Sequence, residues 1–322
     1  MRAIRIHEFG EPKDLRVDEV PRPEPGPGEV LVRVRCAALN FPDILKIAGK
    51  HQNKIEPPFA PGSEFSGTVE AVGEGVEGYP LGERVFARTG HGGFVEYVAV
   101  PVDKVVRTPE AMPDEDAAVF SLVYHTSYIA LVHRARLQPG ETVLVHSAAG
   151  GVGLAAVQIA RAKGAGKIIG TVGSDEKADA VRENGADVVV NYRTGDFVEV
   201  VKRETDGRGA DIIYDSVGGE VSERSTKCIA SEGRILIIGF TSGAFSKFRS
   251  NHILVKNYSV IGVLIGRTNA SASRRCWDEL LALYEEGALK PVISHRFPME
   301  EAAAAMEVLT SRKVIGKIVL SW

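Results

Sequence analysis

The chain has 322 residues, of which 44% are hydrophobic, and a formal net charge of −3 at pH 7. That length fits two domains of ordinary size, and the hydrophobic content is typical of globular proteins with substantial cores. The small net charge gives no electrostatic reason to expect a nucleic-acid or anionic-membrane partner, and no apolar stretch approaches the length of a membrane span.

Cysteine usage and the first residues bear on the compartment. Cys36, Cys228 and Cys276 lie far apart, and none belongs to a C-x-x-C pair. Sparse cysteines of this kind suit a reducing environment. Residues 1–10 alternate like a strand and lack the apolar core of a signal peptide. We therefore expect a cytoplasmic protein.

The region 1–105 carries strand patterns punctuated by glycine and proline. Glu29–Cys36 alternates apolar and polar residues, which is typical of a half-buried strand. Residues 21–28 contain four prolines in P-R-P-E-P-G-P-G and are predicted to be an extended connector. The other strand candidates are Gly67–Val72, Glu83–Ala87 and Phe94–Val100. This pattern predicts a compact, mostly antiparallel β domain.

A glycine turn lies near the middle of the chain. Residues 141–153 read E-T-V-L-V-H-S-A-A-G-G-V-G and precede a helical pattern. A strand, a glycine turn and a helix in this order predict a dinucleotide-binding unit, although Ala148 replaces the first glycine of G-x-G-x-x-G. The alternative is an ordinary glycine-rich turn. The candidate cofactor-binding residues of the turn are Ala149, Gly150, Gly151, Val152 and Gly153.

Strands and helices alternate after this turn. The strand candidates are Val143–His146, Lys167–Val172, Val188–Asn191, Ile212–Asp215, Ile235–Gly239 and Val260–Leu264. The alternation predicts a doubly wound parallel sheet, whose ligands bind at the carboxyl ends of the strands. Val217, Gly239 and Phe240 follow two such strands and are candidate cofactor contacts, with plain βα turns as the alternative.

The end of the second of these strands indicates the type of nicotinamide cofactor. NAD-specific domains place an acidic residue here to bind the ribose 2′-hydroxyl. This chain has Gly173 and Ser174, which leave room for a phosphate, and Lys177, which could pair with it. Asp175 is an opposing charge if it points toward that phosphate. On balance the sequence predicts NADPH.

The C-terminal region has helix patterns at Ala272–Glu286 and Glu300–Ser311 and a final strand at Gly316–Leu320. We expect that strand to pair with the first domain. The predicted organisation is therefore a catalytic domain of residues 1–123 and 265–322, into which a dinucleotide-binding domain of residues 124–264 is inserted.

The order of these parts resembles a known family. The chain reads N-F-P-D-I-L at 40–45, P-G-S-E-F-S-G at 61–67 and V-G-E-G-V at 72–76, ahead of A-A-G-G-V-G. It is similar to the zinc-independent quinone oxidoreductases of the medium-chain dehydrogenase/reductase superfamily, which include zeta-crystallin. The resemblance implies an α/β protein with a GroES-like β-barrel catalytic domain and a doubly wound Rossmann domain. It also implies an NADPH-dependent reductase of quinones or α,β-unsaturated carbonyls.

The same resemblance bears on metal binding. Zinc-dependent relatives take metal ligands from the positions that here hold Asn40 and Ser63. Glu64 alone cannot supply the three-ligand set of a catalytic zinc site. We therefore expect no metal. Without a Lewis acid, reduction of an acceptor that is already electrophilic is favoured over alcohol oxidation.

Candidate residues for the reacting end of the site also follow from the resemblance. Thr126 matches a threonine near the nicotinamide, with an ordinary helix residue as the alternative. Asn40, at a metal-ligand position, is predicted to donate to the developing oxyanion. His51 stands where relatives commonly have a tyrosine and is a candidate proton donor, with a solvated loop residue as the alternative. Further cofactor contacts implied by the family are Tyr192, Leu264 and Arg312.

Other functions remain open at this point. An enoyl-thioester reductase shares the architecture, and a non-catalytic nucleotide- or RNA-binding role belongs to a different class, although the net charge argues against strong binding to nucleic acid. The family pattern and the apolar segment 257–264, which could be an edge strand, predict a homodimer.

Overall fold

The computed structural model describes residues 1–267 and 270–322 and divides into two compact units. The first contains Met1–Leu122 and Ile293–Trp322, and the second contains Val123–Val292. The predicted first boundary lies one residue away. The second boundary lies at 292/293, where 264/265 was expected, so the segment 265–292 groups with the second unit.

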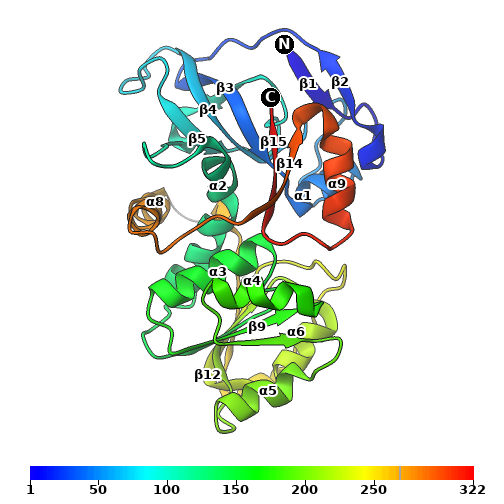
Figure 1. The fold of residues 1–322 in the computed structure, drawn as a ribbon, viewed down its shortest axis with the longest axis vertical. Coiled ribbons are helices and arrows are strands. Elements are labelled where there is room, and N and C mark those ends of the chain that lie inside the picture. The colour runs from blue at the N-terminus through cyan, green and yellow to red at the C-terminus, as the bar shows by residue number, and fades with distance from the viewer. Residues whose placement is uncertain (268–269) are drawn as a thin grey trace. The chain divides into compact units, whose positions relative to one another are not determined.

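The first unit is built on a seven-stranded sheet in the order β14-β15-β3-β4-β5-β7, with β6 paired to β3 (Figure 1). Its pairings are antiparallel except β14 with β15. A separate ladder joins β1 (Arg2–Arg5) to β2 (Arg16–Glu19). The strands of the main sheet are β3 (Glu29–Ala38), β4 (Glu64–Val72), β5 (Arg84–Arg88), β6 (Tyr97–Pro101), β7 (Val105–Arg107), β14 (Ile293–Pro298) and β15 (Lys317–Ser321).

The two ends of the chain meet in this sheet. β15 pairs antiparallel with β3, as the sequence predicts for the last strand (Figure 1). The core beneath it combines strand residues such as Phe65 and Ile318 with Met306 of α9 (Ala302–Thr310). β14 was not predicted from the sequence, because its segment I-S-H-R-F-P has three consecutive polar residues and ends in proline.

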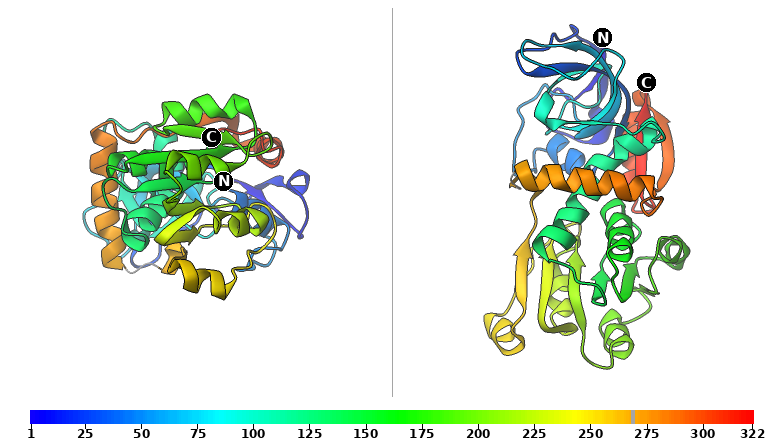
Figure 2. Two further views of the ribbon diagram at one scale, coloured as in Figure 1. Left: turned by 90° about the horizontal axis from the view of Figure 1, so that it is seen from below. Right: turned by 90° about the vertical axis from the view of Figure 1, so that its left-hand side faces the viewer.

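The second unit contains a six-stranded sheet in the order β10-β9-β8-β11-β12-β13, and every pairing is parallel. β13 is therefore an edge strand (Figure 2). The strands are β8 (Thr142–Val145), β9 (Lys167–Val172), β10 (Val188–Asn191), β11 (Ala210–Asp215), β12 (Ile229–Ile237) and β13 (Ser259–Gly262). The doubly wound parallel sheet expected from the sequence is confirmed, although β12 begins at Ile229, six residues earlier than predicted, since its first half reads A-S-E-G-R.

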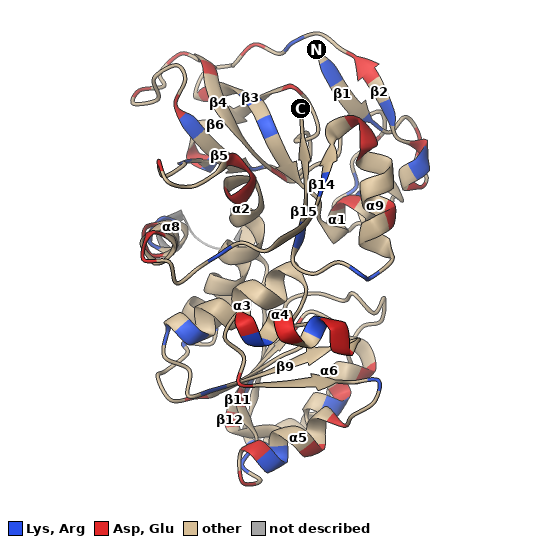
Figure 3. Cartoon of the chain, in the orientation of Figure 1, with Lys and Arg blue, Asp and Glu red and all other residues tan. Residues whose placement is uncertain are grey.

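Short helices follow the strands. They are α3 (Gly151–Ala162), α4 (Ala178–Glu183), α5 (Phe197–Glu204), α6 (Gly219–Ser225) and α7 (Ser250–Lys256). The other helices of the chain are α1 (Phe41–Ile47), α2 (Asp114–Tyr128) and α8 (Ala270–Glu285). Residues of both charge signs are interspersed on α4 and α5 (Figure 3), so these helices present no surface of a single sign.

Candidate functional site

The glycine turn joins β8 to α3 as the sequence predicts. The first helical hydrogen bond runs from Leu154 N to Gly150 O, so the N–H groups of residues 151–153 precede it and are available at the helix N-terminus. A Cβ on Gly153 would lie 2.3 Å from Ser147 O and 2.7 Å from Ala148 Cα. Glycine at 153 is therefore required for the helix to approach the strand this closely. The N-terminus that results suits a pyrophosphate.

The missing first glycine of the motif has a structural explanation. Ala148 is fully buried, and its N–H donates to Thr171 O in β9. A Cβ placed on Gly170 would lie 3.0 Å from Ala148 Cβ and 2.8 Å from Val181 Cγ1. Gly170 thus supplies the space that the methyl group of Ala148 occupies, so the turn accommodates alanine in place of glycine.

A buried histidine supports the start of this turn. His146 lies between Thr171 Oγ1, 3.1 Å from Nδ1, and Ser225 Oγ, 2.8 Å from Nε2. Ser225 donates its hydroxyl hydrogen to Val221 O, so it accepts from His146 Nε2–H, and Nδ1 accepts from Thr171. Burial lowers the pKa of His146 to about 4, and the ring is neutral at pH 7.

The turn after β11 is held by a carboxylate. Asp215 is fully buried and accepts from the N–H groups of Val217 and Gly218 at 2.8 and 3.0 Å, and from Ser222 Oγ. The N–H of Val217 is therefore used inside the protein, which leaves its side chain and carbonyl for any cofactor contact. The loop after β12, with Gly239 and a partly exposed Phe240, is tied to this turn because Thr241 N donates to Ser216 O.

Two cations lie near the end of β9. Burial lowers the pKa of Lys177, and Arg193 lowers it further, so the two side chains are electrostatic neighbours. Asp175 accepts from Asn191 Nδ2 at 3.0 Å. A Cβ on Gly173 would lie 2.8 Å from the hydroxyl oxygen of Tyr192, which is 42% exposed. The structure thus brings Gly173, Lys177 and Tyr192 together around a positive region, to which Arg193 adds a charge that was not predicted from the sequence.

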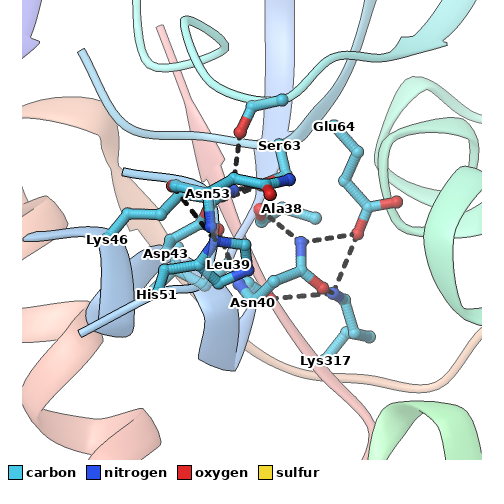
Figure 4. Close-up of polar contacts among 11 residues, drawn as sticks. Ala38, Leu39, Asn40, Asp43, Lys46, His51, Asn53, Ser63, Glu64 and Lys317 are labelled. Atoms are coloured by element: carbon cyan, nitrogen blue, oxygen red, sulfur yellow. Dashed lines mark hydrogen bonds and ion pairs between the residues drawn. The ribbon is translucent and has the colours of Figure 1, made fainter. Parts of the chain in front are cut away.

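The first unit holds a different kind of site, a buried polar network (Figure 4). Asn40 Oδ1 accepts from Lys317 Nζ at 2.6 Å, and Asn40 Nδ2 donates to Glu64 Oε1 at 3.0 Å and to Ala38 O at 3.3 Å. Lys317 Nζ closes the triangle, 2.9 Å from Glu64 Oε1. Both hydrogens of the Asn40 amide are therefore occupied, which departs from the expected oxyanion donor with free N–H groups.

The second oxygen of Glu64 is also satisfied. It accepts from Ser121 Oγ and from Leu122 N, each at 2.7 Å. A carboxylate that is 0% exposed and makes four such contacts is stable only because every oxygen lone pair has a donor.

A second triangle lies around Ser63. Lys46 Nζ donates to Ser63 Oγ at 2.6 Å, and Ser63 donates to Asp43 Oδ1 at 2.6 Å. Lys46 also contacts Gly90 O at 2.6 Å and Asp43 Oδ1 at 3.4 Å. Burial raises the pKa of Asp43, and the charge of Lys46 opposes that rise. The two positions that hold metal ligands in zinc-dependent relatives, Asn40 and Ser63, thus each contact a lysine ammonium.

The remaining predicted residues are dispersed. His51 is half-buried, and its Nδ1 lies 3.1 Å from Asn53 N and 3.3 Å from Asn53 O. Thr126 is a half-buried residue of α2, and Leu264, 55% exposed, follows β13. Arg312 is an exposed residue of the first unit with a positive φ of 60°. The network residues Asp43, Lys46 and Lys317 were missed from the sequence.

Within residues 1–267 and 270–322 no group of three or more His, Cys, Asp or Glu side chains is arranged to hold a metal ion. No helix in that part of the chain is long and apolar enough to cross a membrane.

Comparison with known proteins agrees with this geometry. Residues 26–110 match the family of alcohol dehydrogenase GroES-like domains, and residues 151–286 match the family described as zinc-binding dehydrogenase. Together with the seven-stranded, mostly antiparallel sheet and the six-stranded parallel sheet, these matches define the medium-chain dehydrogenase/reductase class.

Individual relatives identify the family within this class. The quinone oxidoreductase-like protein 2 homolog of Nematostella vectensis is 38% identical over 99% of this chain and 88% of its own length. Escherichia coli quinone oxidoreductase, solved in complex with NADPH, has a TM-score of 0.93 at 32% identity and covers 100% of each chain. A 2-haloacrylate reductase has a TM-score of 0.88 at 32% identity, covering 100% of this chain and 99% of its own. The chain belongs to the quinone oxidoreductase family.

Proposed function

We propose that the protein is an NADPH-dependent reductase that transfers hydride to quinones or other electrophilic α,β-unsaturated carbonyl compounds without a metal ion. The observation that carries the proposal is the N-terminus of α3, which Gly153 allows to pack closely against Ser147 and Ala148. The positive charges at Lys177 and Arg193 add to it. The NADPH complex of the Escherichia coli relative and the acceptor named for 2-haloacrylate reductase support it.

The residues present fit such a cofactor. The free N–H groups of residues 151–153 would bind the pyrophosphate. Lys177 and Arg193 would pair with the 2′-phosphate, and Tyr192 would lie against it, with Arg312 as a further candidate. Bound NADPH supplies the hydride. Thr126, Val217, Gly239, Phe240 and Leu264 remain the proposed contacts along the rest of the cofactor.

The acceptor becomes a hydroquinone or a saturated carbonyl compound, so it gains one hydride and one proton. Because the N–H groups of Asn40 are occupied, we propose that Asn40 shapes the acceptor site through the network and that a proton comes from the protonated ring of His51 or from solvent.

The deciding experiment follows NADPH absorbance with 1,4-benzoquinone, with crotonyl-CoA and with no acceptor. Turnover with the quinone supports the proposal. Turnover with crotonyl-CoA alone would assign the chain to the enoyl-thioester reductases. Cofactor binding without turnover of any acceptor would favour a non-catalytic nucleotide-binding role.

Two lysine side chains support the proposal that the protein works without a metal ion. Lys46 and Lys317 place ammonium groups 2.6 Å from Ser63 and Asn40, and these charges would repel a divalent cation. Activity that persists after dialysis against a chelator, with no zinc found by elemental analysis, is the expected result. Stoichiometric zinc whose removal abolishes activity would contradict it.

We also propose a homodimer formed through the second unit, in the cytoplasm. β13 is an edge strand, and Leu254 and Val255 on the preceding α7 are 80% and 82% exposed. Unpaired edges and exposed apolar side chains both favour a partner. Light scattering should give twice the mass of one chain, and a single-chain mass would refute the dimer.

The free, buried cysteines suit a reducing compartment.

A further inference from the structure

β5 ends in an arginine whose guanidinium has no partner in the described part of the chain. Arg84, at the other end of the same strand, is fully engaged: its guanidinium binds Asp114 Oδ1 at 2.7 Å, Met112 O and Glu110 O. The guanidinium of Arg88, four residues on, makes no hydrogen bond or ion pair with any described residue, although Arg88 is only partly exposed. Five N–H donors are left for something outside the chain.

The carboxylate opposite Arg88 is already engaged by other donors. Arg88 lies directly opposite Glu64 in the β4–β5 ladder, so both side chains belong to one face of the sheet. Glu64 gives one oxygen to Lys317 and Asn40 and the other to Ser121 and Leu122. Its charge raises the pKa of Arg88, but burial lowers that pKa more, which indicates an incompletely compensated cation.

The charge balance of the buried network leads to the same conclusion. Lys46 and Lys317 are matched by Asp43 and Glu64, two cations against two carboxylates. Arg88 adds a further positive charge beside a network that is already neutral. A partly desolvated charge without a counter-ion is costly, so it is retained where a ligand supplies the opposite charge.

From these observations we propose that Arg88 is a binding residue for a carboxylate carried by the acceptor. The planar guanidinium fork matches a carboxylate with two parallel hydrogen bonds. Arg88 faces the Glu64–Asn40 side of the sheet, at the position where zinc-dependent relatives bind metal, and the phosphates of a dinucleotide already have the α3 N-terminus in the other unit. The acceptor class is therefore an α,β-unsaturated carbonyl compound with a free carboxylate. This inference rests on the proposed reductase function.

The test uses two acceptors with the same enone skeleton, trans-3-benzoylacrylate and its uncharged methyl ester, with wild type, Arg88→Met and the control Arg33→Met. Arg33 is an exposed arginine of β3 in the same sheet. We expect Arg88→Met to lower kcat/KM for the acid about ten- to a hundredfold, mostly through KM, and to leave the ester unchanged, as loss of charge-assisted hydrogen bonds predicts. Arg33→Met should change neither.

A binding measurement keeps the test independent of turnover. The acid should raise the Tm of the wild type and of Arg33→Met, but not that of Arg88→Met, and the Kd of NADPH should be the same in all three. Equal loss with acid and ester, a weaker Kd for NADPH, or an unchanged response of Arg88→Met to the acid would each overturn the inference. A wild type that oxidises NADPH with neither acceptor nor with benzoquinone would refute the proposed function, while the Tm shift would still decide the role of Arg88.

Discussion

The two compact units build their candidate sites by opposite means. In the second unit, the nucleotide turn depends on backbone: Gly153 permits close packing, Gly170 makes room for Ala148, and α3 presents its N–H groups. In the first unit, the site depends on buried charged side chains around Asn40 and Ser63. The difference teaches that one site is sensitive to added volume and the other to lost charge.

The largest expected effect comes from breaking the charge network. Lys317→Met leaves the carboxylate of Glu64 buried without its ammonium, and we expect a loss of about 3–5 kcal/mol in the free energy of unfolding. Urea unfolding measures it, with the exposed Lys313→Met as the control. Adding Glu64→Gln to Lys317→Met should restore part of the loss. A decrease below about 1 kcal/mol would show that the network is not held by this pair.

The turn is probed by adding a single methyl group. In Gly153→Ala the new Cβ meets backbone atoms at 2.3 and 2.7 Å, so we expect a loss of about 2–3 kcal/mol in unfolding free energy. Gly150→Ala meets its nearest neighbour at 3.3 Å with a φ of −78°, so it should cost less than about 1 kcal/mol and still weaken NADPH binding by blocking close approach. Urea unfolding measures the packing role of Gly153, and NADPH titration measures the binding role of Gly150. A larger stability loss in Gly150→Ala than in Gly153→Ala would contradict these assignments.

His146 gives the second unit one side chain with a pH response. Its folded-state pKa of about 4 lies below the ordinary value of 6.5, so the unfolded chain takes up the proton first. The stabilisation is complete above pH 6.5 and is lost as the pH falls toward 4, by about 2 kcal/mol between pH 7.5 and 5. Unfolding of wild type and His146→Gln at both pH values tests this. An equal slope in the two proteins would assign the acid sensitivity to other groups.

The smallest expected effect is on cofactor preference. Lys177→Ala removes one of two neighbouring cations and should reduce the NADPH-to-NADH ratio of kcat/KM by about tenfold. Arg193→Ala should act in the same direction, and Lys163→Ala serves as a charge control on the same unit, since the half-buried Lys163 pairs with Glu279 instead. A wild type that prefers NADH would contradict the phosphate site itself.

The same comparison explains what could be predicted from the sequence. The parallel sheet, the turn and the pairing of the last strand all follow from local patterns of glycine and apolar residues. The network does not, because Asn40 and Lys317 are 277 residues apart and a lone lysine in a strand carries no local signal of burial. Lys46 in F-P-D-I-L-K-I likewise resembles an ordinary solvated residue of an amphipathic helix.

The free N–H groups assigned to Asn40 could not be checked from sequence either. The side-chain amide of asparagine always has two N–H donors, and only the distances from Asn40 Nδ2 to Glu64 and Ala38 show that both are used. The sequence also could not predict that the Arg88 guanidinium lacks a partner, because this depends on the four donors that already bind Glu64. Spacing predicts which residues share an element, and hydrogen-bond satisfaction requires coordinates.

The discontinuity of the first unit has a consequence for the order in which the protein is made. When synthesis has reached residue 292, the second unit is complete, but β14 and β15 do not yet exist. Until then the edge of β3 at residues 36–38 is unpaired, and Glu64 lacks the ammonium of Lys317. The second unit can therefore fold while the nascent chain is still growing, whereas the first unit is completed only after β14 and β15 have been synthesised.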